Sequence, residues 1–309
     1  RAYFPHYCLV GGDSRLHEWL DAELPRMADA PEGVRLAIAA PRGEAKSTFV
    51  SLFFVLWAVL TGRKHYILII ADALEQAASL LGAVKDELEF NEALKRDFPG
   101  AGKGHVWNVG TVVTPGNVKI QALGAGKRMR GLRHGPHRPD LIVLDDLEND
   151  GNVDKPEQRD KLQSWLQKTV LNLGAADGSM DVVYVGTLLH YDSVLARTLR
   201  KPLWKARTFR SILRWPDRMD LWDEWESLLS SRGEAEARRF YRQHRVKMEA
   251  GAEVSWPASR PLYRLMCLRA EDREAFDSEQ QNDPLSANEA PFNGCITFWV
   301  DRSRDWLLF

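Results

Sequence analysis

Apolar runs of strand length alternate with segments of helix length between residues 34 and 186, and this alternation limits the fold more than any other feature. Continuously apolar runs such as 65–71 and 141–144 are typical of strands buried on both faces of a sheet. Strands that alternate with helices form mostly parallel sheets with helices on both faces. We therefore expect an α/β fold. Its predicted strands are 34–40, 65–71, 117–123, 141–144 and 182–186, and its predicted helices are 46–61, 73–94 and 154–173.

The pattern changes after about residue 213, where four helical segments follow one another without an intervening strand. Trp222 and Trp225 are candidate anchors of a small separate core. We therefore expect a core domain over 1–212, a helical lid or linker subdomain over 213–290, and over 291–309 a linker that runs into a truncated further domain. The predicted helices of the subdomain are 217–229, 234–248, 260–269 and 270–282.

Composition excludes several other classes of protein. Apolar residues make up 44% of the 309 residues, which is enough for a buried core and excludes a disordered chain. The 42 basic and 43 acidic residues give a net charge of −1, so a chain coated with positive charge for nucleic acid is not expected. The three cysteines show no metal or disulfide spacing, and the longest apolar stretch, 49–60, is too short to span a bilayer. The chain opens with Arg1 and stops within an apolar run, so we expect both ends to be cut from a longer protein.

The segment Ala-Pro-Arg-Gly-Glu-Ala-Lys-Ser-Thr at 40–48 lies between a predicted buried strand and a predicted helix. A loop there can direct backbone N–H groups at phosphate, a lysine can reach the terminal phosphates, and the next hydroxyl can hold Mg²⁺. Lys46 and Ser47 supply these two groups. Ala40 and Ala45 stand where the usual G-x-x-x-x-G-K-[ST] pattern has glycine, and Ala45 would be strained at positive φ. The alternative interpretation is an ordinary helix start.

A second motif follows about a hundred residues later, where the apolar run 141–144 ends in Asp145 and Asp146. This is the order and position of a Walker B strand. Asp145 would hold Mg²⁺, and the next acidic group, either Asp146 or Glu148, would polarise an attacking water. An Asp-Asp turn after a strand is the plainer alternative, but it does not explain why both motifs follow predicted strands in this order.

Two further features complete the candidate site. Thr187 follows the predicted strand 182–186 and could sense a γ-phosphate at the strand tip. Just before the Walker B segment, residues 127–138 carry five cations and two histidines. Gly and Pro in this run favour a loop, which could contact a phosphate backbone or supply an arginine finger to a neighbouring subunit. Arg42, inside the candidate phosphate loop, is another candidate phosphate contact.

Taken together, these segments resemble the large terminase subunit of tailed bacteriophages, the ATP-driven motor that packs DNA into proheads. PRGEAKST at 41–48 is similar to the deviant phosphate loop of that family, in which alanine replaces the second glycine. The resemblance covers nearly the whole chain. The other segments that carry it are YFPHY at 3–7, MRGLRHGPHRPDLIVLDDLEND at 129–150, VVYVGTLLHYDS at 182–193 and FDSEQQNDP at 276–284.

The resemblance implies a P-loop NTPase of the additional-strand (ASCE) type with a small lid subdomain. It implies that Pro41, Arg42, Gly43, Glu44, Ala45, Lys46, Ser47 and Thr48 bind ATP, and that Ser47 and Asp145 hold Mg²⁺. Asp146 replaces the family's usual glutamate, so Glu148 stays open as the base, and Thr187 would couple hydrolysis to the lid. Arg130 matches the family's Arg-Gly pair and is the first candidate for the finger that acts in trans, with Arg133 and Arg138 nearby.

The resemblance further implies a motor that moves double-stranded DNA. Its partners would be other copies of itself in a ring, the portal protein, a small terminase subunit and the DNA, with no membrane involved. It would act in the host cytoplasm at the portal vertex of the prohead. The family's C-terminal nuclease would begin after residue 309, so we expect no DNA cleavage by this chain. Two alternatives remain: a helicase-like or recombinase-like ATPase, and a nucleotide-binding scaffold without turnover, which the two missing glycines favour.

Overall fold

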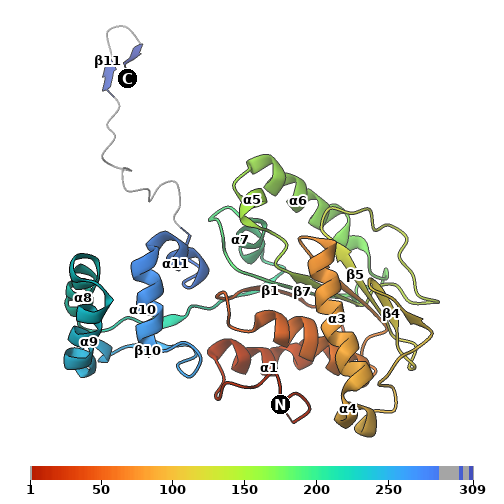
Figure 1. Ribbon diagram of the computed structural model, residues 1–309. Helices are drawn as coiled ribbons and strands as arrows, with labels where there is room; N and C mark the ends of the chain where they lie inside the picture. The colour runs from red at the N-terminus through yellow and green to blue at the C-terminus, as the bar shows by residue number, and fades with distance from the viewer. Residues whose placement is uncertain (1, 285–298, 302–305, 309) are drawn as a thin grey trace.

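The centre of the molecule is an eight-stranded sheet, ordered β3-β4-β5-β2-β6-β7-β1-β8 and mostly parallel (Figure 1). The computed structural model describes residues 2–284, 299–301 and 306–308. The α/β fold expected from the sequence is confirmed. The strands are β1 (Arg35–Ala39), β2 (Tyr66–Ala71), β3 (Val106–Trp107), β4 (Thr111–Val113), β5 (Lys119–Gly124), β6 (Leu141–Asp145), β7 (Asp181–Gly186) and β8 (Lys205–Thr208).

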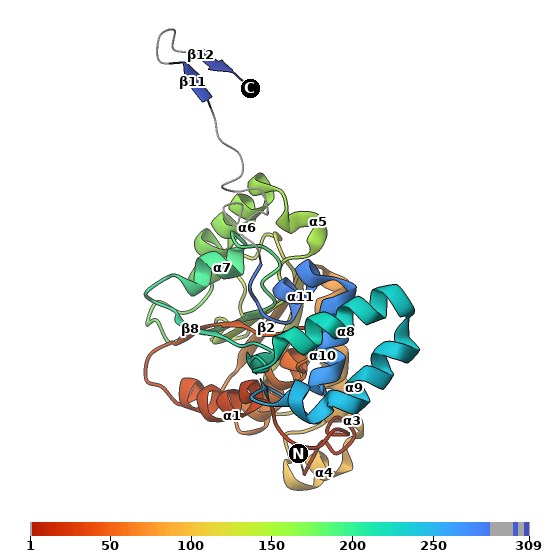
Figure 2. The same cartoon turned by 90° about the vertical axis from the view of Figure 1, so that its left-hand side faces the viewer.

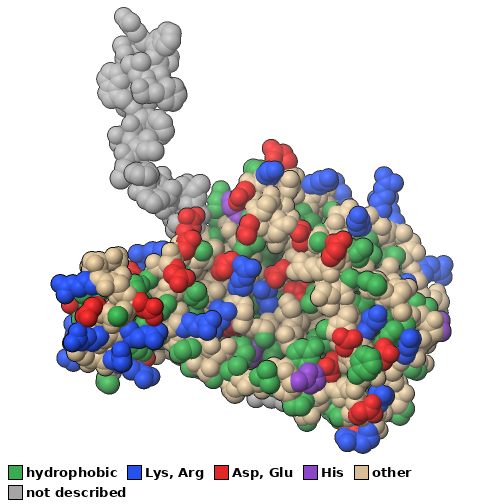
Figure 3. Space-filling view, viewed as in Figure 1, with side chains coloured by type: hydrophobic (Ala, Val, Ile, Leu, Met, Phe, Trp, Pro, Cys, Tyr) green, Lys and Arg blue, Asp and Glu red, His purple; other side chains and the backbone are tan. Residues whose placement is uncertain are grey.

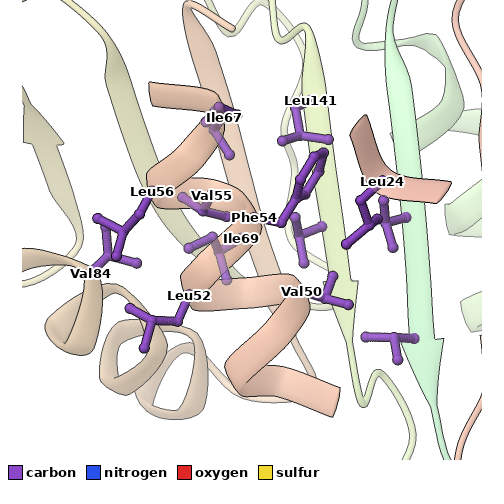
Figure 4. Close-up of a cluster of buried hydrophobic side chains, with 14 of the residues drawn as sticks. Leu24, Val50, Leu52, Phe54, Val55, Leu56, Ile67, Ile69, Val84 and Leu141 are labelled. Carbon is purple, nitrogen blue, oxygen red and sulfur yellow. The ribbon is translucent and has the colours of Figure 1, made fainter. Parts of the chain in front are cut away.

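Helices cover both faces of the sheet, and the alternation of side chains along the strands decides which core each residue joins. Ile67 and Ile69 of β2 pack with one set of helices, whereas Leu68 and Ile70 pack with the other. Figure 4 shows the first of these cores, where the helix that follows β1 lies against β2 and β6. The first set is α1 (Arg15–Ala28), the π-helix η1 (Thr48–Phe54), α2 (Val55–Leu60), α3 (Leu74–Phe90) and α4 (Glu92–Asp97). The second set is α5 (Asp150–Val153), α6 (Pro156–Lys168), the 3₁₀ turn η2 (Val170–Asn172) and α7 (Val194–Leu199).

The position of β7 in the sheet explains how distant segments meet. β7 pairs in parallel with β1 on one side and with β6 on the other. One additional strand therefore separates the strand before the 40–48 loop from the strand that ends in Asp145, as the ASCE arrangement requires. Because the carboxyl ends of parallel strands meet at one edge, the segments after β1, β6 and β7 are brought together there.

Several predicted boundaries were wrong. The predicted helix 73–94 is divided at Asn91, whose side chain accepts hydrogen bonds from the backbone of Ala93 and Leu94 and so begins α4. The bounds of the predicted helix 46–61 agree with the helical residues 46–60, but its part η1 is a π-helix. The predicted helix 154–173 starts at Pro156, ends at Lys168 and is followed by a 3₁₀ turn.

The four helices expected after residue 213 are present and lie together (Figure 2). They have a hydrophobic core of their own. Trp222 and Trp225 are fully buried in this core, and Trp222 donates a hydrogen bond to the carbonyl of Met248 (2.8 Å). A short antiparallel ladder of β9 (Ile212–Arg214) and β10 (Glu253–Val254) closes the unit. The helices are α8 (Met219–Arg232), α9 (Glu234–Glu249), α10 (Leu262–Glu271) and α11 (Arg273–Glu279).

Within the predicted final segment, β11 (Trp299–Asp301) and β12 (Trp306–Leu308) form an antiparallel pair. The rest of the linker predicted over 291–309 lies outside the described residues, so the division into three domains stays a prediction.

Among the described residues, no helix has both the length and the apolar character needed to cross a membrane.

Candidate functional site

A cavity lies beyond the carboxyl ends of β1, β6 and β7, beside the last turn of α11. Acidic and basic side chains gather in the hollow between the helical subdomain and the sheet (Figure 3). The cavity brings together five of the residues predicted from the sequence. Its lining is Arg42, Lys46, Asp72, Gln76, Asp146, Glu148, Asn149, Asp150, Thr187, Leu189 and Glu279.

The 40–48 loop contains two residues with positive φ, one of them an alanine where the predicted motif usually has glycine. Gly43 has φ 81° and Ala45 has φ 55°. The left-handed conformation costs a residue with a side chain roughly 1–2 kcal/mol, so Ala45 stores strain at this loop. The strain expected at this position is therefore present, and the fold tolerates it.

Lys46 is buried at the centre of the constellation. Its Nζ donates to Thr187 Oγ1 (3.1 Å) and lies 3.3 Å from Asp146 Oδ2. The Thr187 hydroxyl lies 3.2 Å from the carbonyl oxygen of Ala40, to which it donates. The residues directly after β1, β6 and β7 therefore meet here. Asp146 and Thr187 contact the ammonium group of Lys46, and the carbonyl of Ala40 contacts Thr187.

Asp145 is fully buried and is held by two hydroxyls of the helix after the loop. Ser47 Oγ donates to its Oδ1 (2.9 Å) and Ser51 Oγ donates to its Oδ2 (2.5 Å). Burial and the adjacent Asp146 raise the pKa of Asp145 to about 6, against the opposing effects of Ser51, Lys46 and Ser47. A carboxylate and a hydroxyl in contact are hard oxygen donors of the kind Mg²⁺ uses, with phosphate and water completing its shell. The residues therefore fit the predicted ion, and no cluster of three acidic, His or Cys ligands occurs among the described residues.

The two candidate bases differ in what their carboxylates contact. Both oxygens of Glu148 accept hydrogen bonds, from the backbone N–H groups of Val194 (2.8 Å) and Leu195 (3.1 Å) and from the hydroxyl of Tyr184 (3.3 Å). Glu148 therefore accepts hydrogen bonds from backbone N–H groups in the first turn of α7, which have no acceptor within the helix. Both carboxylates line the cavity, but Asp146 has Lys46 beside it and has φ 44°, a strained conformation of the kind that collects at functional sites. The geometry favours Asp146.

The other predicted residues lie at or beyond the rim. The guanidinium of Arg42 is exposed and pairs with Glu279 (2.5 Å). Pro41 is buried, and Thr48 starts the π-helix. Arg130 is exposed on the 127–138 loop and is not among the residues that line the cavity. Arg133 and Arg138 are exposed too, so the structure separates the basic run from the cavity of its own chain.

Glu44, also in the 40–48 loop, does not line the cavity. It is 1% exposed and accepts a hydrogen bond from Ser255 Oγ (3.1 Å). Burial raises the pKa of Glu44 to about 7 from an ordinary value of 4.5. A neutral Glu44 carboxyl would not repel a phosphate bound to this loop.

We expect Glu44→Gln to stabilise the fold at high pH only. Because the pKa of Glu44 is raised on folding, the folded chain binds more protons than the unfolded chain between about pH 4.5 and 7. Wild-type stability should fall as pH rises through this window, whereas glutamine carries no charge to desolvate. The variant should gain up to about 3 kcal/mol in free energy of unfolding at pH 8. Urea unfolding at pH 5 and pH 8 checks this, with the exposed Glu224→Gln as control; an equal gain at both pH values would contradict it.

Sequence reasoning missed four residues that the structure brings to this region. Ser51 follows Ser47 by one helical turn, a spacing that could have indicated a shared face. Glu279, Asn282 and Arg260 come from the helical subdomain, and only the fold shows that they approach the loop. An added Cβ on Gly43 would lie 1.8 Å from Arg260 Nη2, so the arginine closes over the loop.

Comparison with known proteins gives the following picture. Neither models of known protein families nor curated proteins match the chain. Among solved structures, the large terminase of bacteriophage HK97 is similar over 82% of this chain, with 18% identity and a TM-score of 0.45.

The other two of these structures are of the large terminase ATPase domain of Thermus phage P74-26. One matches 85% of this chain at 14% identity and a TM-score of 0.43 and is covered over 92% of its length. The other, an arginine-to-alanine mutant, matches 85% at 12% identity and a TM-score of 0.43 and is covered over 93%. The chain spans about half (53%) of the HK97 large terminase.

Proposed function

We propose that the chain hydrolyses Mg²⁺-ATP in the cavity at the ends of β1, β6 and β7. One observation carries this proposal: Lys46 reaches both Thr187 and Asp146, while the adjacent Ser47 contacts Asp145. These are the groups that phosphate binding, ion binding and water activation need, and they converge from three neighbouring strands.

Each residue then has one task. Lys46 and the backbone N–H groups of the 40–48 loop would bind the terminal phosphates, with the start of the following helix directed at them. Ser47 and Asp145 would hold Mg²⁺, which neutralises charge on the phosphates. The incoming phosphate would compete with Asp146 for Lys46, because both are anions beside one ammonium group. Asp146, released from this pair, would accept a proton from the attacking water.

We further propose that hydrolysis drives movement of double-stranded DNA, as the resemblance of the motifs to phage large terminases implies. The exposed cations of the 127–138 loop support a role between subunits. Met129 buries its side chain in the second core and Trp165 Nε1 donates to the carbonyl of Lys127 (2.9 Å), so the loop is held at its start. Arg130 projects from this anchored segment and could serve a neighbouring copy's cavity, with the portal and a small subunit as further partners.

The test is ATP turnover by mixtures of two inactive variants. Lys46→Ala retains Arg130, and Arg130→Ala retains an intact cavity. If the finger acts in trans, mixing should restore part of the turnover, and wild-type turnover should rise faster than linearly with protein concentration. Turnover by Arg130→Ala at the wild-type rate would contradict the trans role. Unwinding of a DNA duplex by the wild-type chain would favour the helicase alternative over a packaging motor.

A further inference from the structure

The end of α11 and the residues directly after it, 279–282, are polar but largely buried; we call this segment the α11 clasp. Gln280, Gln281 and Asn282 are each 5% exposed. Buried amides cost free energy unless they are hydrogen-bonded, so their partners define what the segment holds together. Both side-chain partners of Asn282, Leu188 and Phe209, lie at the sheet, outside the helical unit that contains α11.

Asn282 bridges two strand ends. Its Oδ1 accepts from the backbone N–H of Leu188 (2.9 Å), and its Nδ2 donates to the carbonyl of Phe209 (2.8 Å). Leu188 follows Thr187 at the tip of β7, and Phe209 follows β8. β7 and β8 are the two neighbours of β1, so one amide side chain spans the end of the strand that leads into the phosphate loop. Asn282 itself has φ 49°, a conformation that asparagine tolerates better than most residues.

The other end of the clasp is attached to the loop itself. The carbonyl of Glu279 accepts from the backbone N–H of Arg42 (2.9 Å), and its carboxylate pairs with the Arg42 guanidinium. Gln280 Oε1 accepts from Arg260 (2.5 Å), the arginine that lies against Gly43, and from Ser211 (3.1 Å). The clasp therefore fixes the position of the β7 tip relative to the loop.

We propose that Asn282 is a positioning residue for ATP hydrolysis, which holds the tip of β7 so that Thr187 stays in hydrogen-bond contact with Lys46. This inference rests on the proposed function. Asn282 is not among the residues that line the cavity; it would act through the backbone of Leu188. A small displacement of a residue that positions reacting groups costs rate more than affinity, up to about 100-fold for 1 Å. The phosphate contacts of the loop do not depend on this amide, so ATP affinity should be preserved.

The test compares two variants of Asn282 in the whole chain. Asn282→Gly keeps the left-handed backbone but loses both hydrogen bonds, and Asn282→Asp keeps an acceptor for Leu188 while losing the donor to Phe209. Asn117→Gly is the matched control, because Asn117 is also an asparagine at positive φ (59°) but is exposed and remote from the cavity. The readouts are kcat, the Kd for ATP, the melting temperature, and hydrogen exchange of the Leu188 amide.

We expect Asn282→Gly to lower kcat by about tenfold or more, with a Kd for ATP within about twofold of wild type and faster exchange at Leu188. Asn282→Asp should restore part of kcat, and Asn117→Gly should match wild type. Wild-type kcat in Asn282→Gly would overturn the inference, as would parallel losses of kcat, ATP affinity and melting temperature, which indicate a purely structural role. A wild-type chain without turnover above Lys46→Ala contradicts the proposed function and this inference with it. Equal turnover by wild type and Asn282→Gly contradicts the inference alone.

Discussion

Replacing Lys46 by alanine should lower kcat for ATP by at least about 100-fold. The ammonium group is buried between Thr187 and Asp146, where water screens it less than at the surface. Charge that develops on the transferred phosphate would therefore lose its nearest cation. Steady-state phosphate release at saturating ATP measures the effect.

The matched control for this variant is Lys247→Ala. Lys247 lies exposed near the end of α9, in the helical subdomain, so its loss should leave turnover unchanged. Lys46→Ala removes a buried cation from beside Asp146, so its melting temperature must be measured alongside kcat. A folded Lys46→Ala chain that keeps wild-type turnover would exclude the cavity as the site of hydrolysis.

The second large effect separates the two candidate bases. Asp146→Asn should lower kcat by about 10²–10⁴-fold, the usual contribution of a general base. Glu148→Gln should instead change kcat by less than about threefold and lower the free energy of unfolding by about 1–2 kcal/mol, because it weakens the hydrogen bonds that the carboxylate accepts from α7 and Tyr184. Phosphate release and urea unfolding of both variants measure the two effects.

Asp223→Asn, an exposed change on α8, is the control for loss of an acidic group. If Glu148→Gln abolishes turnover while its stability stays at the wild-type value, Glu148 is the base and its contacts with α7 are secondary. A large loss in both variants would mean that the two carboxylates act together.

The sequence was most informative where the fold buries whole strands. β2, β6 and β7 are buried along their entire length. Apolar residues therefore occupy successive positions in these strands and do not alternate with polar ones, which makes the strands easy to recognise. The residues directly after such strands could then be assigned to one edge, which is why Lys46, Asp146 and Thr187 were predicted together. The 40–48 segment was predicted to be a phosphate loop from Lys46 and Ser47, although Ala45 adopts a backbone conformation that usually selects glycine.

Local patterns were less informative where structure depends on distant partners. The two and three residues of β3 and β4 are too few to show a period. Helix α1 was missed although Leu16, Leu20, Leu24 and Met27 form a buried stripe, because Pro25 lies within it. Glu148 reads as a second acidic residue after a strand, and only the fold shows that it meets α7. The clasp at 279–282 reaches Leu188 and Arg42 across the chain, which no spacing within the sequence reveals.

The central claim is that this chain converts ATP to ADP and phosphate in the cavity beside Lys46, and phosphate release by the wild-type chain tests it most directly. The assay should cover a wide range of protein concentrations at pH 8, with Mg²⁺ or with a chelator, beside Lys46→Ala. Our account predicts release that requires Mg²⁺, rises more steeply than protein concentration, and disappears in Lys46→Ala. ATP binding without phosphate release above the Lys46→Ala background, at every concentration, would contradict it and favour a nucleotide-binding scaffold.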